Sequence, residues 1–313
     1  MDIVILLISL VAIVLGAGWF VDGAAGLARR LHVSDFVIGA AIVGVGTSFP
    51  EMIVSLTGAF EGNGAVAVGN VVGSNIFNLL GILGLTALLF PVATTKANQK
   101  IDIPICFGLS ILVLLLAFNF FATGDPVIGR LDGLILLACF GAYMWWSLKK
   151  GRESAAPVSE KPQMPVWKLI SLLVFGLTVL IIGCNHFVDE AILIARKLNV
   201  NDAFISITLI ACGTSLPELA VSLAAALKKN TQMALGNVIG SNIFNISLIL
   251  GLSSQVMPLE LSGVTFIDFV VMIAAAGLVW LMGRNKKISR WEGAILFSAF
   301  IGYNVWLIFN QLA

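Results

Sequence analysis

Long apolar segments alternate with short polar segments along the whole chain. Ten segments come close to the roughly 20 mostly apolar residues that a helix needs to cross a bilayer. They are 3–27, 35–60, 65–90, 101–121, 127–148, 168–195, 202–227, 232–258, 263–283 and 291–311. The pattern predicts an all-α integral membrane protein with ten transmembrane helices.

Composition supports the membrane class. Of 313 residues, 59% are hydrophobic and only 11% are charged, whereas soluble domains are about a quarter charged. The net charge of +1 and the lack of a basic run give no sign of a nucleic-acid partner. The first apolar segment is longer than a signal-peptide core and follows an acid, so we interpret it as a retained span. The four cysteines show no metal-ligand spacing and are expected to be buried.

Positive charge is distributed unevenly between the two sides of the predicted spans. If the N-terminus is outside, 15 of the 18 Lys and Arg residues face the cytoplasm and only Arg130, Arg196 and Lys197 face out. Cytoplasmic loops carry such an excess. We therefore expect both termini outside and residues 149–167 to form a cytoplasmic linker. The linker is too short for a folded regulatory domain.

The chain is an internal duplication. Residues 46–85 and 213–252 align without a gap at an offset of 167, with 24 of 40 positions identical. The two halves, 1–148 and 168–313, each contain five predicted spans. An odd number of spans reverses direction, so the second half is expected to be inverted. Inverted repeats are a transporter architecture with its binding site near the bilayer midplane.

Two acids lie deep within predicted spans, and they are equivalent by the repeat. A carboxylate in the bilayer core must be protonated, paired or bound to a cation, and Glu51 and Glu218 have no basic residue at similar depth. Pro50 and Pro217 precede them and predict a kinked or unwound backbone around Thr47 and Thr214. Freed carbonyl oxygens at membrane depth are tolerated where they line a cavity or meet an ion.

A second repeated motif adds amide and hydroxyl groups. "GNVVGSNIFN" at 69–78 returns as "GNVIGSNIFN" at 236–245. A polar stripe with a spacing of four is formed by Asn70, Ser74 and Asn78, and its counterpart by Asn237, Ser241 and Asn245. Helix packing explains its glycines. We expect Asn78 and Asn245 to line the site. Carboxylate, carbonyl and amide oxygens suit Ca²⁺ and Na⁺. Two carboxylates balance one Ca²⁺, and competition between ions for them is a physical basis for exchange.

These paired motifs resemble the alpha-repeats of the cation/calcium exchanger superfamily, and most of all its prokaryotic sodium/calcium exchangers. The resemblance covers the whole chain, with alpha motifs at 44–85 and 211–252. It implies calcium ligands at Glu51 and Glu218 and at the backbone oxygens of Thr47 and Thr214. The sodium sites that it implies use those four residues and add Gly44, Ser48, Ser74, Asn78, Ala211, Ser215, Ser241 and Asn245.

The resemblance has further implications. Asn245 stands where some relatives carry Asp, which argues against potassium dependence. Spans one and six resemble a tilted gating pair that slides against the other helices, and we expect their Asp22 and Asp189 at the surface. The implied function is secondary antiport of Na⁺ for Ca²⁺ by alternating access. The protein is expected to be no enzyme, to have no catalytic residue, and to need neither cofactor nor protein partner. We expect the protein in a cell membrane, which for a prokaryotic protein would be the inner membrane.

Other functions remain open at this point. A calcium/proton antiporter could use the same glutamates, although the duplicated Ser and Asn oxygens exceed what a proton mechanism requires. An intramembrane hydrolase using Ser48 or Ser215 would lack a deep His or Lys to activate the serine. A calcium channel is disfavoured by the inverted repeat. Stoichiometry, direction of transport and oligomeric state do not follow from the sequence.

Overall fold

The computed structural model describes residues 2–118, 126–153, 164–197, 213–261 and 263–312. Eight of its helices are long and apolar enough to span a membrane, and a bent helix pair over 35–60 provides a ninth candidate. The protein is therefore an all-α integral membrane protein, as the sequence predicts. Of the predicted span 202–227, the second half forms a shorter apolar helix and the first half lies outside the described residues. The total of ten spans thus stays a prediction.

The elements follow one another in this order. The first half contains α1 Asp2–Leu31, α2 Asp35–Ile38, π-helical Gly39–Val43, α3 Gly44–Thr47, α4 Phe49–Phe60, α5 Gly64–Ile76, π-helical Phe77–Ile82, α6 Leu83–Leu89, β1 Val92–Ala93, π-helical Asn98–Asp102, α7 Ile103–Phe118, β2 Val127–Ile128 and α8 Arg130–Glu153. The second contains α9 Val166–Lys197, α12 Leu216–Leu227, α13 Thr231–Phe244, π-helical Asn245–Ile249, α14 Leu250–Val256, β3 Leu259–Glu260, α15 Phe266–Met282, 3₁₀-helical Gly283–Asn285, β4 Lys287–Ile288 and α16 Arg290–Leu312.

The structure adds features that the hydropathy pattern did not predict. Four two-residue strands join the ends of helices, and π-helical turns interrupt the two central helices from Phe77 and from Asn245, at the end of each repeated motif. Hydropathy averages over many residues, so it cannot detect a single extra residue in a helical turn. The helix ends differ from the predicted spans by a few residues, and α1 continues to Leu31. The predicted linker 149–167 lies largely outside the described residues.

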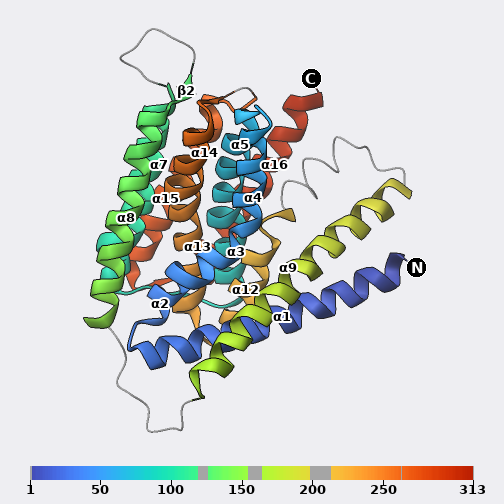
Figure 1. The fold of residues 1–313 in the computed structure, drawn as a ribbon, viewed down its shortest axis with the longest axis vertical. Coiled ribbons are helices and arrows are strands. Elements are labelled where there is room, and N and C mark those ends of the chain that lie inside the picture. The colour runs from blue at the N-terminus through green and yellow to red at the C-terminus, as the bar shows by residue number, and fades with distance from the viewer. Residues whose placement is uncertain (1, 119–125, 154–163, 198–212, 262, 313) are drawn as a thin grey trace.

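The helices form a bundle with a tilted arm at one side (Figure 1). The arm consists of α1 and α9, which run antiparallel and cross at glycines. A Cβ atom on Gly16 would lie 2.6 Å from the backbone nitrogen of Leu180, and one on Gly176 would lie 2.6 Å from that of Phe20. Only glycine permits this approach, so the two long helices pack backbone against backbone. Deep in the bundle, all but the first two residues of α13 are buried.

Contacts at the two ends of the bundle join one repeat to the other. Strand β1 pairs with β4 and β2 pairs with β3, so each short ribbon takes one strand from each half of the chain. Within the first repeat Tyr143 donates a hydrogen bond to Asp102 (3.3 Å), and within the second Tyr303 donates one to Asp268 (2.6 Å). The site-bearing helices α4 and α12 occupy opposite halves of the bundle (Figure 1). Equivalent elements thus recur at opposite ends, as an inverted repeat requires.

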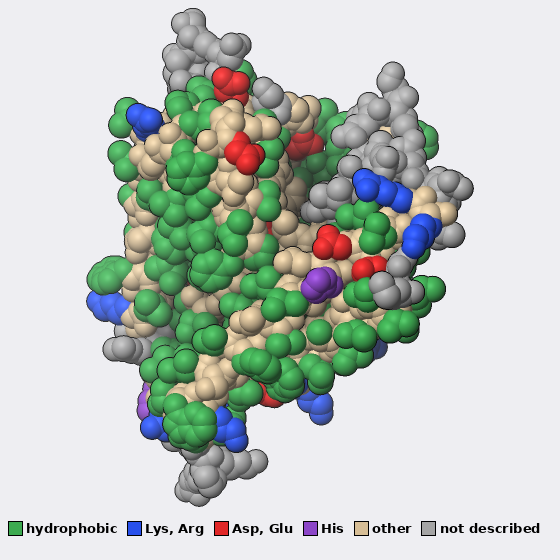
Figure 2. Space-filling view, turned by 45° about the vertical axis from the view of Figure 1, so that its right-hand side comes forward, with side chains coloured by type: hydrophobic (Ala, Val, Ile, Leu, Met, Phe, Trp, Pro, Cys, Tyr) green, Lys and Arg blue, Asp and Glu red, His purple; other side chains and the backbone are tan. Residues whose placement is uncertain are grey.

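The surface has the distribution expected of a membrane protein. Figure 2 shows a broad area of hydrophobic side chains on the visible face of the bundle, with the visible Lys and Arg side chains near its ends or on the arm. Large exposed hydrophobic side chains include Trp145, Trp291 and Phe309. A contiguous apolar surface of this extent marks contact with lipid.

Candidate ion-binding site

The backbone breaks where the sequence predicts a kink. The helical segments 35–47 and 49–60 meet at an angle of 48° at Ser48, and Pro50 lies in the first turn of α4. In the second repeat, Thr214 and Ser215 form a turn, and Pro217 lies in the first turn of α12. Proline is tolerated in a first turn because its missing N–H has no intrahelical partner there. The predicted irregularity is confirmed at both places.

Each glutamate is held by a serine of the other repeat. The hydroxyl of Ser48 donates a hydrogen bond to Oε1 of Glu218 at 2.8 Å, and that of Ser215 donates to Oε1 of Glu51 at 2.6 Å. Both glutamates are fully buried.

An asparagine in each repeat connects the glutamate of its own repeat to the threonine of the other repeat. The amide of Asn70 donates to the backbone oxygen of Glu51 at 3.0 Å, and that of Asn237 donates to the backbone oxygen of Glu218 at 3.1 Å. Their side-chain oxygens accept in turn from the hydroxyls of Thr214 (3.5 Å) and Thr47 (3.1 Å). These contacts fix the two broken helices against each other and occupy the threonine hydroxyls, which is compatible with backbone ligation at Thr47 and Thr214.

Four asparagines form a cluster between the repeats. Asn78 donates to the side-chain oxygen of Asn242 (3.3 Å), and Asn245 donates to that of Asn75 (3.1 Å). Asn75 also donates to the backbone oxygen of Asn242 at 3.3 Å. Asn75 and Asn242 were not among the predicted site residues, although the offset of 167 relates them to each other. Their bonds hold the amide nitrogens of Asn78 and Asn245 and leave the amide oxygens of that pair free.

The site contains a set of buried oxygen atoms without a hydrogen-bond partner. They are Oε2 of Glu51, Oε2 of Glu218, Oγ of Ser74, Oδ1 of Asn78 and Oδ1 of Asn245. Leaving a buried acceptor unpaired costs about 1–3 kcal/mol, and more for a charged group. Carboxylate, amide and hydroxyl oxygens are ligands that hard cations such as Na⁺ and Ca²⁺ prefer.

Of the remaining predicted ligands, Ser241 and Gly44 lie at the site and Ala211 cannot be placed. Ser241 donates to the backbone oxygen of Gly44 (3.2 Å) and lies 3.5 Å from Oε1 of Glu218, so the structure brings these three residues together. Ala211 lies outside the described residues.

A cavity lined by described residues of α4 and α9 reaches the site. It has a volume of about 610 Å³, lies between α4 and α9, and extends to Thr214 and Pro217. Val54 on its wall is 37% exposed, whereas Val221, its equivalent on α12, is completely buried. On that opposite side α12 packs against α1, where Val21 is also buried. The two repeats thus have the same sequence motif in different surroundings.

Comparisons with known proteins agree with this architecture. The sequence model of the family described as "Sodium/calcium exchanger protein" matches residues 1–149 and 168–309. The chain is 38% identical to the putative antiporter CaxA of Alkalimonas amylolytica, over 98% of both chains. It is 33% identical to the sodium/calcium exchanger MaX1 of Methanosarcina acetivorans, over 98% of this chain and 99% of the relative.

The fold is also that of a solved exchanger. A structure of the sodium-calcium exchanger NCX_Mj, soaked with zero Na⁺ and Ca²⁺, superposes with a TM-score of 0.85 and 34% identity, covering 98% of each chain. The family match spans most of the chain, and the resemblance of the sequence motifs is confirmed. The chain therefore belongs to the sodium/calcium exchanger protein family, a family of membrane transporters.

Proposed function

We propose that the protein is a secondary active antiporter that exchanges Na⁺ for Ca²⁺ at a site built on Glu51 and Glu218. The observation that carries the proposal is the set of five buried, unpaired oxygens contributed by both repeats. Two of these oxygens belong to carboxylates, which together balance the charge of one Ca²⁺. The relatives named as sodium/calcium exchangers support the choice of ions.

The hydrogen bonds around the glutamates suggest how binding is organised. One oxygen of each carboxylate accepts from a serine, and the other has no partner. A serine can turn its hydroxyl and offer a lone pair to a cation instead. Ser48, Ser74, Ser215 and Ser241 therefore provide the additional coordination positions that several Na⁺ ions require. The backbone oxygens of Gly44, Thr47 and Thr214 complete the proposed set, with Ala211 as the counterpart of Gly44.

Alternating access follows from the unequal surroundings of the two repeats. In this conformer the cavity opens beside α4, and the equivalent face of α12 is covered by α1. If each repeat takes the conformation of the other, the cavity closes and an equivalent one opens on the other side. A site that carries two negative charges crosses the membrane at low cost only when cations neutralise it. Because the site must carry either Ca²⁺ or Na⁺ each time it changes sides, movement of one ion is coupled to movement of the other.

The 15-to-3 distribution of Lys and Arg supports an orientation with both termini outside and the central linker in the cytoplasm. The open cavity then faces outward, on the side of the β2–β3 ribbon. No cofactor and no protein partner are part of the proposal; the bilayer and the two ions are sufficient.

Replacement of the glutamates tests the site. Glu51→Gln or Glu218→Gln removes one charge and keeps the side-chain shape. Because the neutral amide cannot balance the charge of Ca²⁺, either variant should fold but lose nearly all calcium exchange. Glu260→Gln, at an exposed position in β3, is the matched control and should exchange calcium normally. Near-normal calcium flux in either folded site variant would refute the assignment.

A further inference from the structure

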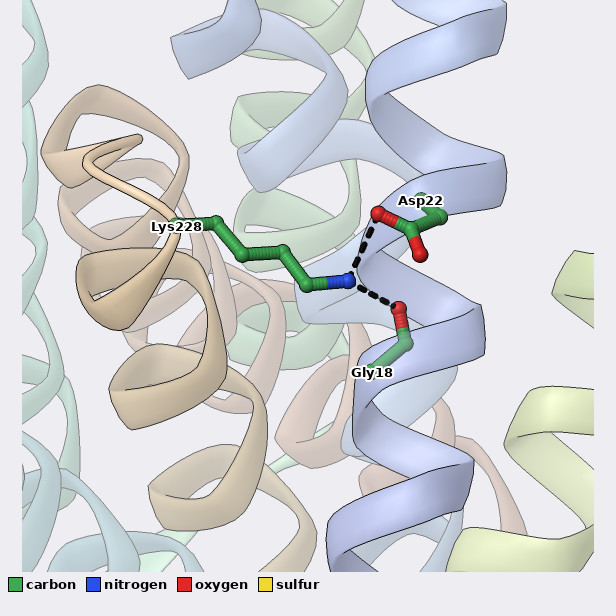
Figure 3. A network of polar contacts seen from close by, with 3 residues as sticks. All are labelled: Gly18, Asp22 and Lys228. Carbon is green, nitrogen blue, oxygen red and sulfur yellow. Dashed lines mark hydrogen bonds and ion pairs between the residues drawn. The ribbon is translucent and has the colours of Figure 1, made fainter.

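One lysine ties the arm to a site-bearing helix. Lys228 directly follows α12, and its Nζ lies 2.6 Å from Oδ1 of Asp22 on α1. The same Nζ donates a hydrogen bond to the backbone oxygen of Gly18 at 2.7 Å. Figure 3 shows how one ammonium group reaches both, because Gly18 and Asp22 are one helical turn apart. A cation at the end of α12 is also stabilised by the helix dipole.

This contact lies on the closed side of the molecule. Close by, Val21 of α1 and Val221 and Ala225 of α12 are buried. A conformer that opens this side must separate α1 from α12, and the Lys228–Asp22 pair must then break. The pair is therefore specific to the present conformer.

The repeat makes the other side of the molecule a direct comparison. The offset of 167 relates Asp22 to Asp189, which borders the cavity on α9. It relates Lys228 to Glu61, an exposed residue that directly follows α4. On the closed side, the contact therefore pairs a lysine with an aspartate. The equivalent contact on the open side, once formed, would bring together two acids. Figure 2 shows acidic side chains on the arm.

We propose that Lys228 is an electrostatic latch that biases the transporter toward the conformer with its cavity open beside α4. The proposal rests on the alternating access described above. Reversal of the conformer breaks the attraction between Lys228 and Asp22 and creates repulsion between Glu61 and Asp189. The two effects act in the same direction.

The expected size of the effect is modest because the pair is partly solvated. The side chains of Lys228 and Asp22 are 37% and 53% exposed. Exposed ion pairs of this kind change an equilibrium by about two- to five-fold, which corresponds to about 0.4–1 kcal/mol. Lys228→Glu replaces attraction by repulsion and should exceed the effect of neutralisation.

A cysteine at Val221 measures opening of the closed side. The four natural cysteines are replaced, and a membrane-impermeant thiol reagent is added from the side that α1 covers. Lys228→Gln and Asp22→Asn should raise the labelling rate about two- to five-fold, since labelling requires separation of α1 and α12. Lys229→Asn removes the neighbouring charge and should leave the rate unchanged. Exchanging the charges, Asp22→Lys with Lys228→Asp, should restore slow labelling.

Glu61→Lys provides an independent test of the latch, because this exposed position can change without disturbing the core. It should also raise labelling at Val221. Adding Asp189→Asn should reverse only part of the increase, because it removes the new attraction while the original repulsion between two acids is also absent. If the cysteine variant does not fold, hydrogen exchange of residues 216–227 in the otherwise natural chain gives the same comparison. Unchanged rates in Lys228→Glu, or failure of the charge exchange to restore slow labelling, would overturn the latch. Loss of the exchange function itself would show separately, as absent sodium-driven calcium flux in the natural chain.

Discussion

One close contact between the repeats near the site involves Gly240 of α13. A Cβ atom at this position would lie 2.7 Å from the backbone oxygen of Ala40 and 2.8 Å from its Cβ. Non-bonded carbon atoms prefer about 3.5–4.0 Å. Gly240→Ala must therefore push α13 about 1 Å away from the π-helical segment Gly39–Val43.

The cost and its functional consequence can be estimated from these contacts. Overpacking of a well-packed interior costs about 1–3 kcal/mol, or about 5- to 150-fold in the ratio of folded to unfolded protein. The same displacement would lengthen the bond from Ser241 to the backbone oxygen of Gly44, now 3.2 Å, beyond hydrogen-bond range. We therefore expect both lower stability and weaker calcium binding.

A matched control separates packing from helix propensity. Gly141 is an exposed glycine inside α8, and a Cβ atom there meets nothing within 4 Å. Both substitutions relieve the conformational cost of glycine in a helix. Unfolding in a detergent titration and calcium binding to the purified protein measure the two effects. If Gly240→Ala is as stable as Gly141→Ala and binds calcium as the unaltered protein does, the packing argument is refuted.

Three further outcomes are expected. Asn245→Asp adds a negative charge beside the two glutamates, so it should change the balance among sodium, potassium and proton effects on calcium flux; an unchanged ion dependence would count against Asn245 as a site residue. Calcium uptake should weaken as pH falls, because protons compete with Ca²⁺ for Glu51 and Glu218; uptake that is insensitive to acid would argue against free carboxylates as ligands. A cysteine at Ser159 should be labelled only from the cytoplasm and one at Gly124 only from outside, and the opposite pattern would reverse the proposed orientation.

The chemistry of the site was predictable because it violates the surrounding pattern. A lone carboxylate after a proline in an apolar span is expensive, and its duplication excludes chance. The sequence therefore predicts the importance of Glu51 and Glu218 and the break in the helices before them. The repeat also led us to expect Asn78 and Asn245 in one site. In the structure both belong to the cluster of four asparagines between the repeats.

The pairing across the repeats was not predictable from one sequence. Which serine meets which glutamate depends on the bend at Ser48 and on how two distant segments dock. Asn242 and Asn75 accept hydrogen bonds from Asn78 and Asn245. Their spacing in the sequence does not distinguish this role from simple packing between helices. Asp22 lies at the surface as expected, but its partner Lys228 is far away in the sequence. Such contacts depend on tertiary structure and leave no local signal.

Calcium flux under an imposed sodium gradient tests the central claim most directly. The protein is reconstituted into sodium-loaded vesicles, and radiolabelled calcium uptake is followed in potassium-free medium, with lithium, potassium and proton gradients as controls. The account predicts uptake that requires the sodium gradient, proceeds without potassium, and is lost in Glu51→Gln and Glu218→Gln. Uptake driven by a proton gradient and not by sodium would contradict the account and identify a calcium/proton antiporter. Uptake that appears only with potassium would contradict the role assigned to Asn245.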